Sequence, residues 1–135
     1  MPKRSTVKRA RKDLREGKRP TTAAGEFVRE EIEHVREGKH GARSTKQAIA
    51  IGLSQARRAG VPLPPPEKGR TSERTRRSAR AAYEVGQGKR RPRAPSRKRS
   101  AAAERALKRE PKRSASRRAL STQAKRAASR RRRDR

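Results

Sequence analysis

The sequence has no cysteine and no tryptophan, and it has one phenylalanine and one tyrosine among 135 residues. The lack of cysteine excludes disulfide bonds and thiolate metal sites, and it fits a reducing interior. The scarcity of aromatic side chains argues against reading of single-stranded nucleic acid, which uses aromatic rings as stacking platforms. No apolar run is long enough for a membrane span, and the basic N-terminus lacks the apolar core of a secretory signal. We therefore expect no membrane partner.

Large apolar side chains are also few. Leu, Ile, Val and Phe together supply 14 residues, about a tenth of the chain. Highly charged sequences below roughly 20% of these residues are typically disordered. Most of the chain should not bury enough apolar area to offset the entropy of ordering it. This reasoning predicts that no globular fold includes the full length.

Positive charge is what the sequence has in excess. Its 43 Lys and Arg residues against 13 Asp and Glu residues give a formal net charge of +30. The charge is uneven: residues 1–20 carry +7, residues 21–60 carry +2 and residues 61–135 carry +21. Such a field attracts polyanions without sequence preference. The nearly neutral middle suggests a folded module with basic arms.

Within this middle third, two helices are predicted, at residues 22–37 and 45–59. In the first, Ala24, Val28, Ile32 and Val35 recur on one face, and Gly38 follows as a left-handed stop. On the opposite side lies an acidic ridge of Glu26, Glu30, Glu33 and Glu37, which either keeps the protein soluble or docks a cationic tail.

The second helix opens with a capping box in which Ser44 is the N-cap and Gln47 stands three residues later. Gly60 ends it, and Val61 can fold back over Ala56. Gly52 lies in the centre of a wide apolar arc, where its cost of about 1 kcal/mol relative to Ala would be compensated by close approach of the first helix. Because the arc exceeds what one helix can cover, the hairpin is expected to dimerise, to order on a partner, or to stay a marginal monomer.

The predicted fold class is therefore mostly α, a short helical hairpin with largely disordered basic arms. We expect a basic N-terminal arm (1–20), the hairpin module (21–61), a proline-rich spacer (62–70), a third helix capped by Ser72 (71–86) and a disordered Arg/Lys/Ala/Ser tail (87–135). Two pieces of the tail, residues 101–109 and 117–128, should be coil when free and partly helical when bound.

The best candidate contact with a polyanion is the edge around the start of the second hairpin helix, where exposed amides could hold a phosphate. Arginine, which outnumbers lysine, engages phosphate with two parallel hydrogen bonds. The candidate nucleic-acid-binding residues are Lys39, Arg43, Ser44, Thr45, Lys46, Arg57, Arg58, Arg90, Arg91, Arg93, Arg97, Lys98, Arg99, Arg117, Arg118, Arg130, Arg131, Arg132 and Arg133.

Signals for other chemistry are missing. His34 and His40 are the only histidines and have no matching Cys or Asp cluster, so no metal site is expected. The stretch GKHGARST lacks the order of a nucleotide-binding loop. No nucleophile–base set or carboxylate pair stands in a foldable pocket. The sequence therefore predicts neither an enzyme nor a cofactor.

The run STKQAIAIGLSQARRAG, with GEFVREEIEHVREGKHGAR ahead of it, resembles a family of small basic bacterial proteins of unknown function. Its pattern is S-x2-Q-A-I-A-I-G-L-S-x-A-R-x-A-G, and members are often labelled DNA-binding or plasmid-stabilisation proteins. The resemblance covers residues 22–61 and implies a bacterial source and association with the nucleoid. The tail is similar to linker-histone tails in composition only.

Three functions are consistent with these features. The first is a cytoplasmic, nucleoid-associated, histone-like protein that binds duplex DNA without sequence preference. The second is a ribosome-associated or other RNA-binding basic protein. The third is a plasmid-maintenance protein whose apolar helix face binds a dedicated partner. Duplex DNA is the preferred partner, because sequence-independent contact with phosphates needs no aromatic platform.

Overall fold

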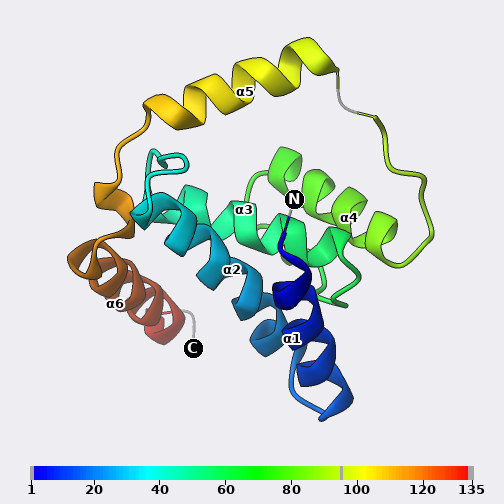
Figure 1. Cartoon of the computed structure of the whole chain (residues 1–135). Coiled ribbons are helices and arrows are strands. Elements are labelled where there is room, and N and C mark those ends of the chain that lie inside the picture. Colours follow the sequence, from blue (N-terminus) through cyan, green and yellow to red (C-terminus); the bar gives the residue numbers. More distant parts are fainter. Residues whose placement is uncertain (1, 95, 134–135) are drawn as a thin grey trace. The chain divides into compact units, whose positions relative to one another are not determined.

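The computed structural model describes residues 2–94 and 96–133 (Figure 1). Helices dominate these residues. They are α1 (Arg4–Arg15), α2 (Pro20–Arg36), α3 (Thr45–Arg58), α4 (Glu73–Gly86), α5 (Arg97–Arg109), the short 3-10 helix η1 (Arg113–Ala115) and α6 (Arg117–Arg133). Each helix is too short or too polar to cross a lipid bilayer, within the part of the chain that the structure describes.

The prediction of a short hairpin with disordered arms is wrong. The N-terminal arm contains α1, and the tail predicted to be disordered contains α5 and α6, whereas α4 is the third helix that the sequence predicted. The count of large apolar residues was misleading because alanine does much of the packing. Ala10 of α1 and Ala79 and Ala82 of α4 are buried, although none of them entered that count. Small side chains let helices approach closely, so burial does not require large residues.

The chain divides into two compact units. Unit 1 comprises the chain up to Glu30 together with Ala50–Ala94, and unit 2 comprises Glu31–Ile49 together with the chain from Pro95 onward. The boundaries fall inside α2 and α3, so each of these helices contributes to both units.

Unit 1 contains the larger apolar core. Phe27 of α2 lies at its centre with no exposed surface, and Ala10, Ala23, Ala24, Ala56, Val61 and Leu63 are buried in the same cluster. Val7 and Leu14 of α1 pack against it. The basic helix α1 is thereby held beside the first part of α2 (Figure 1).

The acidic ridge is not a uniformly solvent-exposed face. Glu30 is buried and accepts a hydrogen bond from the backbone N–H of Lys3 at 2.8 Å. Glu26 forms an ion pair with Arg9 at 3.0 Å. Glu33 and Glu37 remain exposed. The first half of the ridge therefore holds the N-terminal helix.

The sequence predicted that the first hairpin helix approaches closely at Gly52, and the structure confirms it. A Cβ atom at this position would lie 2.7 Å from the Cα atom of Val28, so only glycine lets α3 approach α2 to this degree. Ala48, Gly52 and Ala56 are all buried by the chain's own segments. Ile49, Ile51, Leu53 and Ala59, on the rest of the arc, are only half-buried. Dimerisation through this arc therefore stays a prediction.

The ends of the hairpin helices also follow the local signals. Gly38 and Gly60 have positive φ angles of 79° and 103°. Val61 donates its backbone N–H to the Ala56 carbonyl at 3.1 Å, which is the expected fold-back at the end of α3. The oxygen of Ser72 accepts from the Thr75 N–H and caps α4.

Unit 2 has a small apolar cluster of Val35, Ala42, Ala48 and Ala115, with Ile32 packed against it. Hydrogen bonds supply many of its remaining connections. The N–H groups of Gly41 and Ala42 donate to the carbonyl oxygens of Leu107 and Pro111, at 2.8 and 3.2 Å. These bonds attach the loop after α2 to the last turn of α5 and to the segment between α5 and η1.

Candidate nucleic-acid interface

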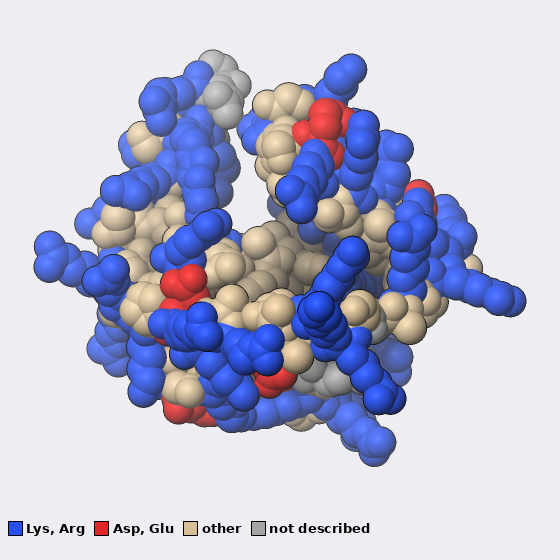
Figure 2. Space-filling model, turned by 90° about the horizontal axis from the view of Figure 1, so that it is seen from above, with Lys and Arg blue, Asp and Glu red and all other residues tan. Residues whose placement is uncertain are grey.

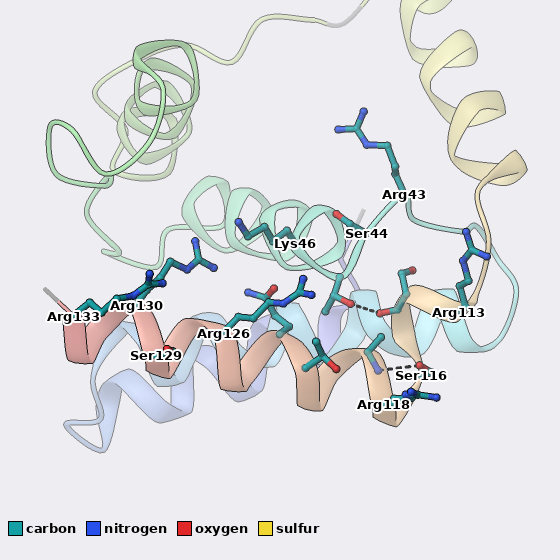
Figure 3. Close-up of a pocket in the computed structure, with 15 residues that line it drawn as sticks. Arg43, Ser44, Lys46, Arg113, Ser116, Arg118, Arg126, Ser129, Arg130 and Arg133 are labelled. Carbon is teal, nitrogen blue, oxygen red and sulfur yellow. Dashed lines mark hydrogen bonds between the residues drawn. The ribbon is translucent and has the colours of Figure 1, made fainter.

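A cleft of about 780 Å³ lies within unit 2 (Figure 3). Three segments line it: the start of α3, the region of η1, and one face of α6. We call it the cationic cleft. Its lining residues are Arg43, Ser44, Thr45, Lys46, Arg113, Ser114, Ser116, Arg118, Ala119, Thr122, Gln123, Arg126, Ser129, Arg130 and Arg133.

The charge of this lining has one sign. Of the described residues that line it, seven are Arg or Lys and none is Asp or Glu. The contribution of α6 follows helical periodicity, since Arg118, Thr122, Arg126 and Arg130 recur every four residues and therefore share one face. The side chains between the arginines are hydroxyls, an amide and an alanine, which donate hydrogen bonds or take little space. Such a surface suits an anion that accepts many hydrogen bonds.

Two helix N-termini open onto the cleft. The Ser44 hydroxyl oxygen accepts from the Gln47 N–H at 3.2 Å and caps α3. The Ser116 hydroxyl oxygen accepts from the Ala119 N–H at 3.1 Å and caps α6. Each N-terminus carries a partial positive charge of roughly half an elementary charge. The cleft therefore combines backbone dipoles with side-chain cations.

The capping box of α3 differs in detail from the predicted one. The side-chain oxygen of Gln47 accepts from the backbone N–H of Arg43 at 2.6 Å, one residue before the N-cap. This bond holds Arg43 at the turn where the chain enters the helix, and its side chain extends outward in Figure 3. Local hydrogen bonding thus fixes the conformation of the chain at the start of α3, which forms one wall of the cleft.

Two side chains hold η1 in place, one from a wall of the cleft and one from the end of α2. The buried Thr45 hydroxyl donates to the Ser114 carbonyl at 2.6 Å across a sequence separation of 69 residues. Arg36 donates through Nε to the Ala115 carbonyl at 2.8 Å. Because both acceptors belong to η1, the Thr45 bond places the residues that precede α6 against the start of α3, and the Arg36 bond places them against the end of α2. These long-range contacts help to form the cleft.

The structure brings some of the predicted residues together in the cleft and leaves others apart. Those that line it are Arg43, Ser44, Thr45, Lys46, Arg118, Arg130 and Arg133. Those that are exposed outside its lining are Lys39, Arg58, Arg90, Arg91, Arg93, Arg97, Lys98, Arg99, Arg117, Arg131 and Arg132. Lys and Arg side chains also cover much of the face drawn in Figure 2.

Arg57 is not an available phosphate ligand, so its prediction needs correction. Only 8% of the residue is exposed. Its guanidinium donates through Nε to the Leu63 carbonyl at 3.2 Å and through Nη2 to the Pro64 carbonyl at 3.1 Å. Burial lowers the pKa of Arg57 below its ordinary value. The residue holds the proline-rich segment after α3, whereas its neighbour Arg58 is exposed.

Several lining residues escaped the sequence analysis. Arg113 and Arg126 are the basic ones, and the polar ones are Ser114, Ser116, Thr122, Gln123 and Ser129. The four-residue spacing from Arg118 to Arg130 could have predicted a basic helix face. The tail is so rich in Arg and Lys, however, that many other spacings in it would predict the same. No local sequence pattern could have placed this face beside the start of α3. The contact that joins them is a hydrogen bond from Thr45 to a backbone carbonyl, which any residue can provide.

Comparisons with known proteins give one match. Residues 3–68 match DUF6496, described as a family of unknown function. No curated protein and no solved structure matches the chain significantly. The matched residues include α1, α2, α3 and the first wall of the cleft, Arg43–Lys46, whereas η1 and α6 lie outside the match.

Proposed function

We propose that this protein binds duplex DNA through its phosphates, without sequence preference, as a nucleoid-associated architectural protein. The observation that carries the proposal is the cationic cleft, which seven basic residues and two helix N-termini line and which no acidic residue lines among those that the structure describes. A helix N-terminus favours an anion, and guanidinium groups bind phosphate oxygens in pairs.

Two aromatic residues bear on the kind of nucleic acid. Phe27 is fully buried in the core of unit 1, and Tyr83 is half-buried on α4. With no Trp in the chain, base stacking has no exposed aromatic platform of the kind that single-strand binders use. Phosphate contacts carry no sequence information by themselves. This supports binding to the backbone of a duplex in preference to reading of unpaired bases.

The exposed cations outside the cleft extend the contact. Arg90, Arg91 and Arg93 precede α5, and Arg97, Lys98 and Arg99 begin it; all six are exposed. If the protein engages about ten phosphates in total, log K against log salt should have a slope near −9. The binding should therefore weaken steeply with salt.

The test compares two triple variants that remove the same charge. The cleft variant is Arg113→Gln, Arg118→Gln, Arg126→Gln, and the control is Arg74→Gln, Arg77→Gln, Arg80→Gln on the exposed side of α4. Fluorescence anisotropy with unrelated duplexes of equal length, over a range of salt, gives affinities and slopes. The cleft variant should lose about 0.9 of slope per phosphate contact removed, so between 2 and 3, and the control should lose much less.

Three results would contradict the proposal. Equal losses in the two variants would mean that net charge alone governs binding. A strong preference of the wild type for one short duplex would exclude sequence-independent binding. Tighter binding of duplex RNA than of duplex DNA at the same salt would assign the cleft to RNA.

A further inference from the structure

The end of α2 and the loop after it bring together three side chains that the sequence did not connect. The carboxylate of Glu31 and the rings of His34 and His40 place one ligand atom each within 4.8 Å of one another. The Glu31 side chain is 3% exposed, and the His34 and His40 side chains are 15% and 17% exposed. The group is separate from the lining of the cationic cleft.

The backbone fixes this arrangement. Glu31 and His34 are three residues apart on α2 and therefore share a face. Gly38 then reverses the chain with a φ of 79°, and the Lys39 N–H donates to the His34 carbonyl at 3.0 Å. The reversal returns His40 to Glu31, and the bond from Gly41 to Leu107 secures the residue that follows.

The contacts of His40 are compatible with a bound metal cation. Its Nδ1 lies 2.8 Å from the Gly41 carbonyl oxygen, and its Nε2 lies 3.1 Å from Oε2 of Glu31. Both partners are acceptors, and a neutral imidazole has only one N–H to donate. If Nδ1–H is donated to the carbonyl, the lone pair of Nε2 faces a buried carboxylate. A cation bound by both atoms would satisfy this contact.

We propose that Glu31, His34 and His40 bind a transition-metal cation of the zinc class. Imidazole and carboxylate donors suit such ions. Donor atoms around tetrahedral Zn²⁺ lie about 3.3 Å apart, from bond lengths near 2 Å. His40 Nε2 lies 3.1 Å from Glu31 Oε2, and His34 Nδ1 lies 3.5 Å from Oε1 of the same carboxylate. Because these are two different oxygens, the three donor atoms, all within 4.8 Å of one another, must draw closer to surround one ion.

The surroundings also fit a metal ligand. Metal-bound histidines usually donate their other ring N–H to a carbonyl or carboxylate, as His40 does to Gly41. Three protein ligands leave one coordination position for water or another oxygen donor. The site would fasten the loop after α2 to the helix at a point three residues before Arg43.

The test uses the full-length protein after removal of nucleic acid and treatment with a chelator. Titration with Zn²⁺ by calorimetry should give one ion per chain, and Co²⁺ should give the intense visible absorption of a four-coordinate site. His34→Gln and His40→Gln should each weaken Zn²⁺ binding by about 100-fold or more, above the range for changes in the outer shell. Glu33→Gln is the matched control, because Glu33 is exposed on the same helix.

Circular dichroism establishes that each variant keeps its helices. The proposal is overturned if the folded wild type takes up less than one Zn²⁺ per chain. It is also overturned if His40→Gln binds Zn²⁺ as tightly as Glu33→Gln, since uptake would then be unspecific.

Discussion

In unit 1 the helices meet through apolar side chains, whereas in unit 2 many contacts between distant segments are hydrogen bonds to backbone carbonyl oxygens. The core of unit 1 surrounds Phe27 and continues through Val61 and Leu63. Among the residues of unit 2 that the structure describes, the buried apolar ones are Val35 and three alanines. Its carbonyls at Leu107, Pro111, Ser114 and Ala115 accept hydrogen bonds from the other part of the unit.

This difference matters for function. Neither α5 nor α6 has a buried residue, and α6 nevertheless forms a wall of the cationic cleft. Hydrogen bonds at η1 hold the N-terminal end of α6, so its arginines stay exposed along its length. A face with a large apolar core would leave less room for cations. In the proposed function, the unit with the smaller core is the one that binds the anion.

The largest effect should come from Phe27→Ala in unit 1. Removal of a fully buried phenyl ring costs about 3–5 kcal/mol, a large part of the stability of a domain of this size. Urea unfolding followed by circular dichroism measures the loss. The comparison is Val35→Ala in unit 2, where two methyl groups are removed and the expected cost is about 2 kcal/mol. An equal loss in the two variants would mean that the two cores do not differ in the predicted way.

A smaller effect should come from Gly52→Ala, which tests close backbone packing in unit 1. The added Cβ would lie 2.7 Å from the Cα atom of Val28, and a backbone atom cannot easily move away. We expect destabilisation of about 2 kcal/mol from overpacking, in spite of the better helix propensity of alanine. Thermal and urea unfolding measure it.

The control for Gly52 is Gly25→Ala. Gly25 also lies within a helix, α2, but a Cβ there would meet nothing within 4 Å. This variant should be more stable than the wild type by up to about 1 kcal/mol. If both variants are stabilised, propensity outweighs packing and the close approach of α2 and α3 does not depend on glycine.

The smallest effect should come from Thr45→Val in unit 2, which removes the hydroxyl donor to Ser114 while it keeps the shape of the side chain. Loss of one buried hydrogen bond should cost about 1 kcal/mol. Amide hydrogen exchange should show faster opening around η1 and the start of α6. Thr122→Val, on an exposed threonine of the cleft, is the control and should leave exchange unchanged. Equal exchange in the two variants would show that the link at Thr45 does not hold η1.

Local chemistry determined much of the hairpin before any tertiary contact was known. Ser44 and Ser72 cap helices because a short hydroxyl side chain satisfies an N–H of the first turn, and Gly38 and Gly60 end helices because glycine adopts a positive φ at little cost. These effects act within a few residues. The role of Gly52 was also readable, because a glycine inside an apolar helix face needs a neighbour to compensate its cost.

Tertiary structure decided the rest. Composition predicted disordered arms because it counts apolar side chains, and it has no measure of alanine packing or of backbone carbonyls as acceptors. It counted Arg57 as a surface cation, but two carbonyls after α3 hold it in the interior. The walls of the cationic cleft and the three side chains around Glu31 meet through contacts that leave no pattern in the sequence. Every residue has the same backbone carbonyl, so only the fold determines which carbonyl oxygens accept hydrogen bonds from distant side chains.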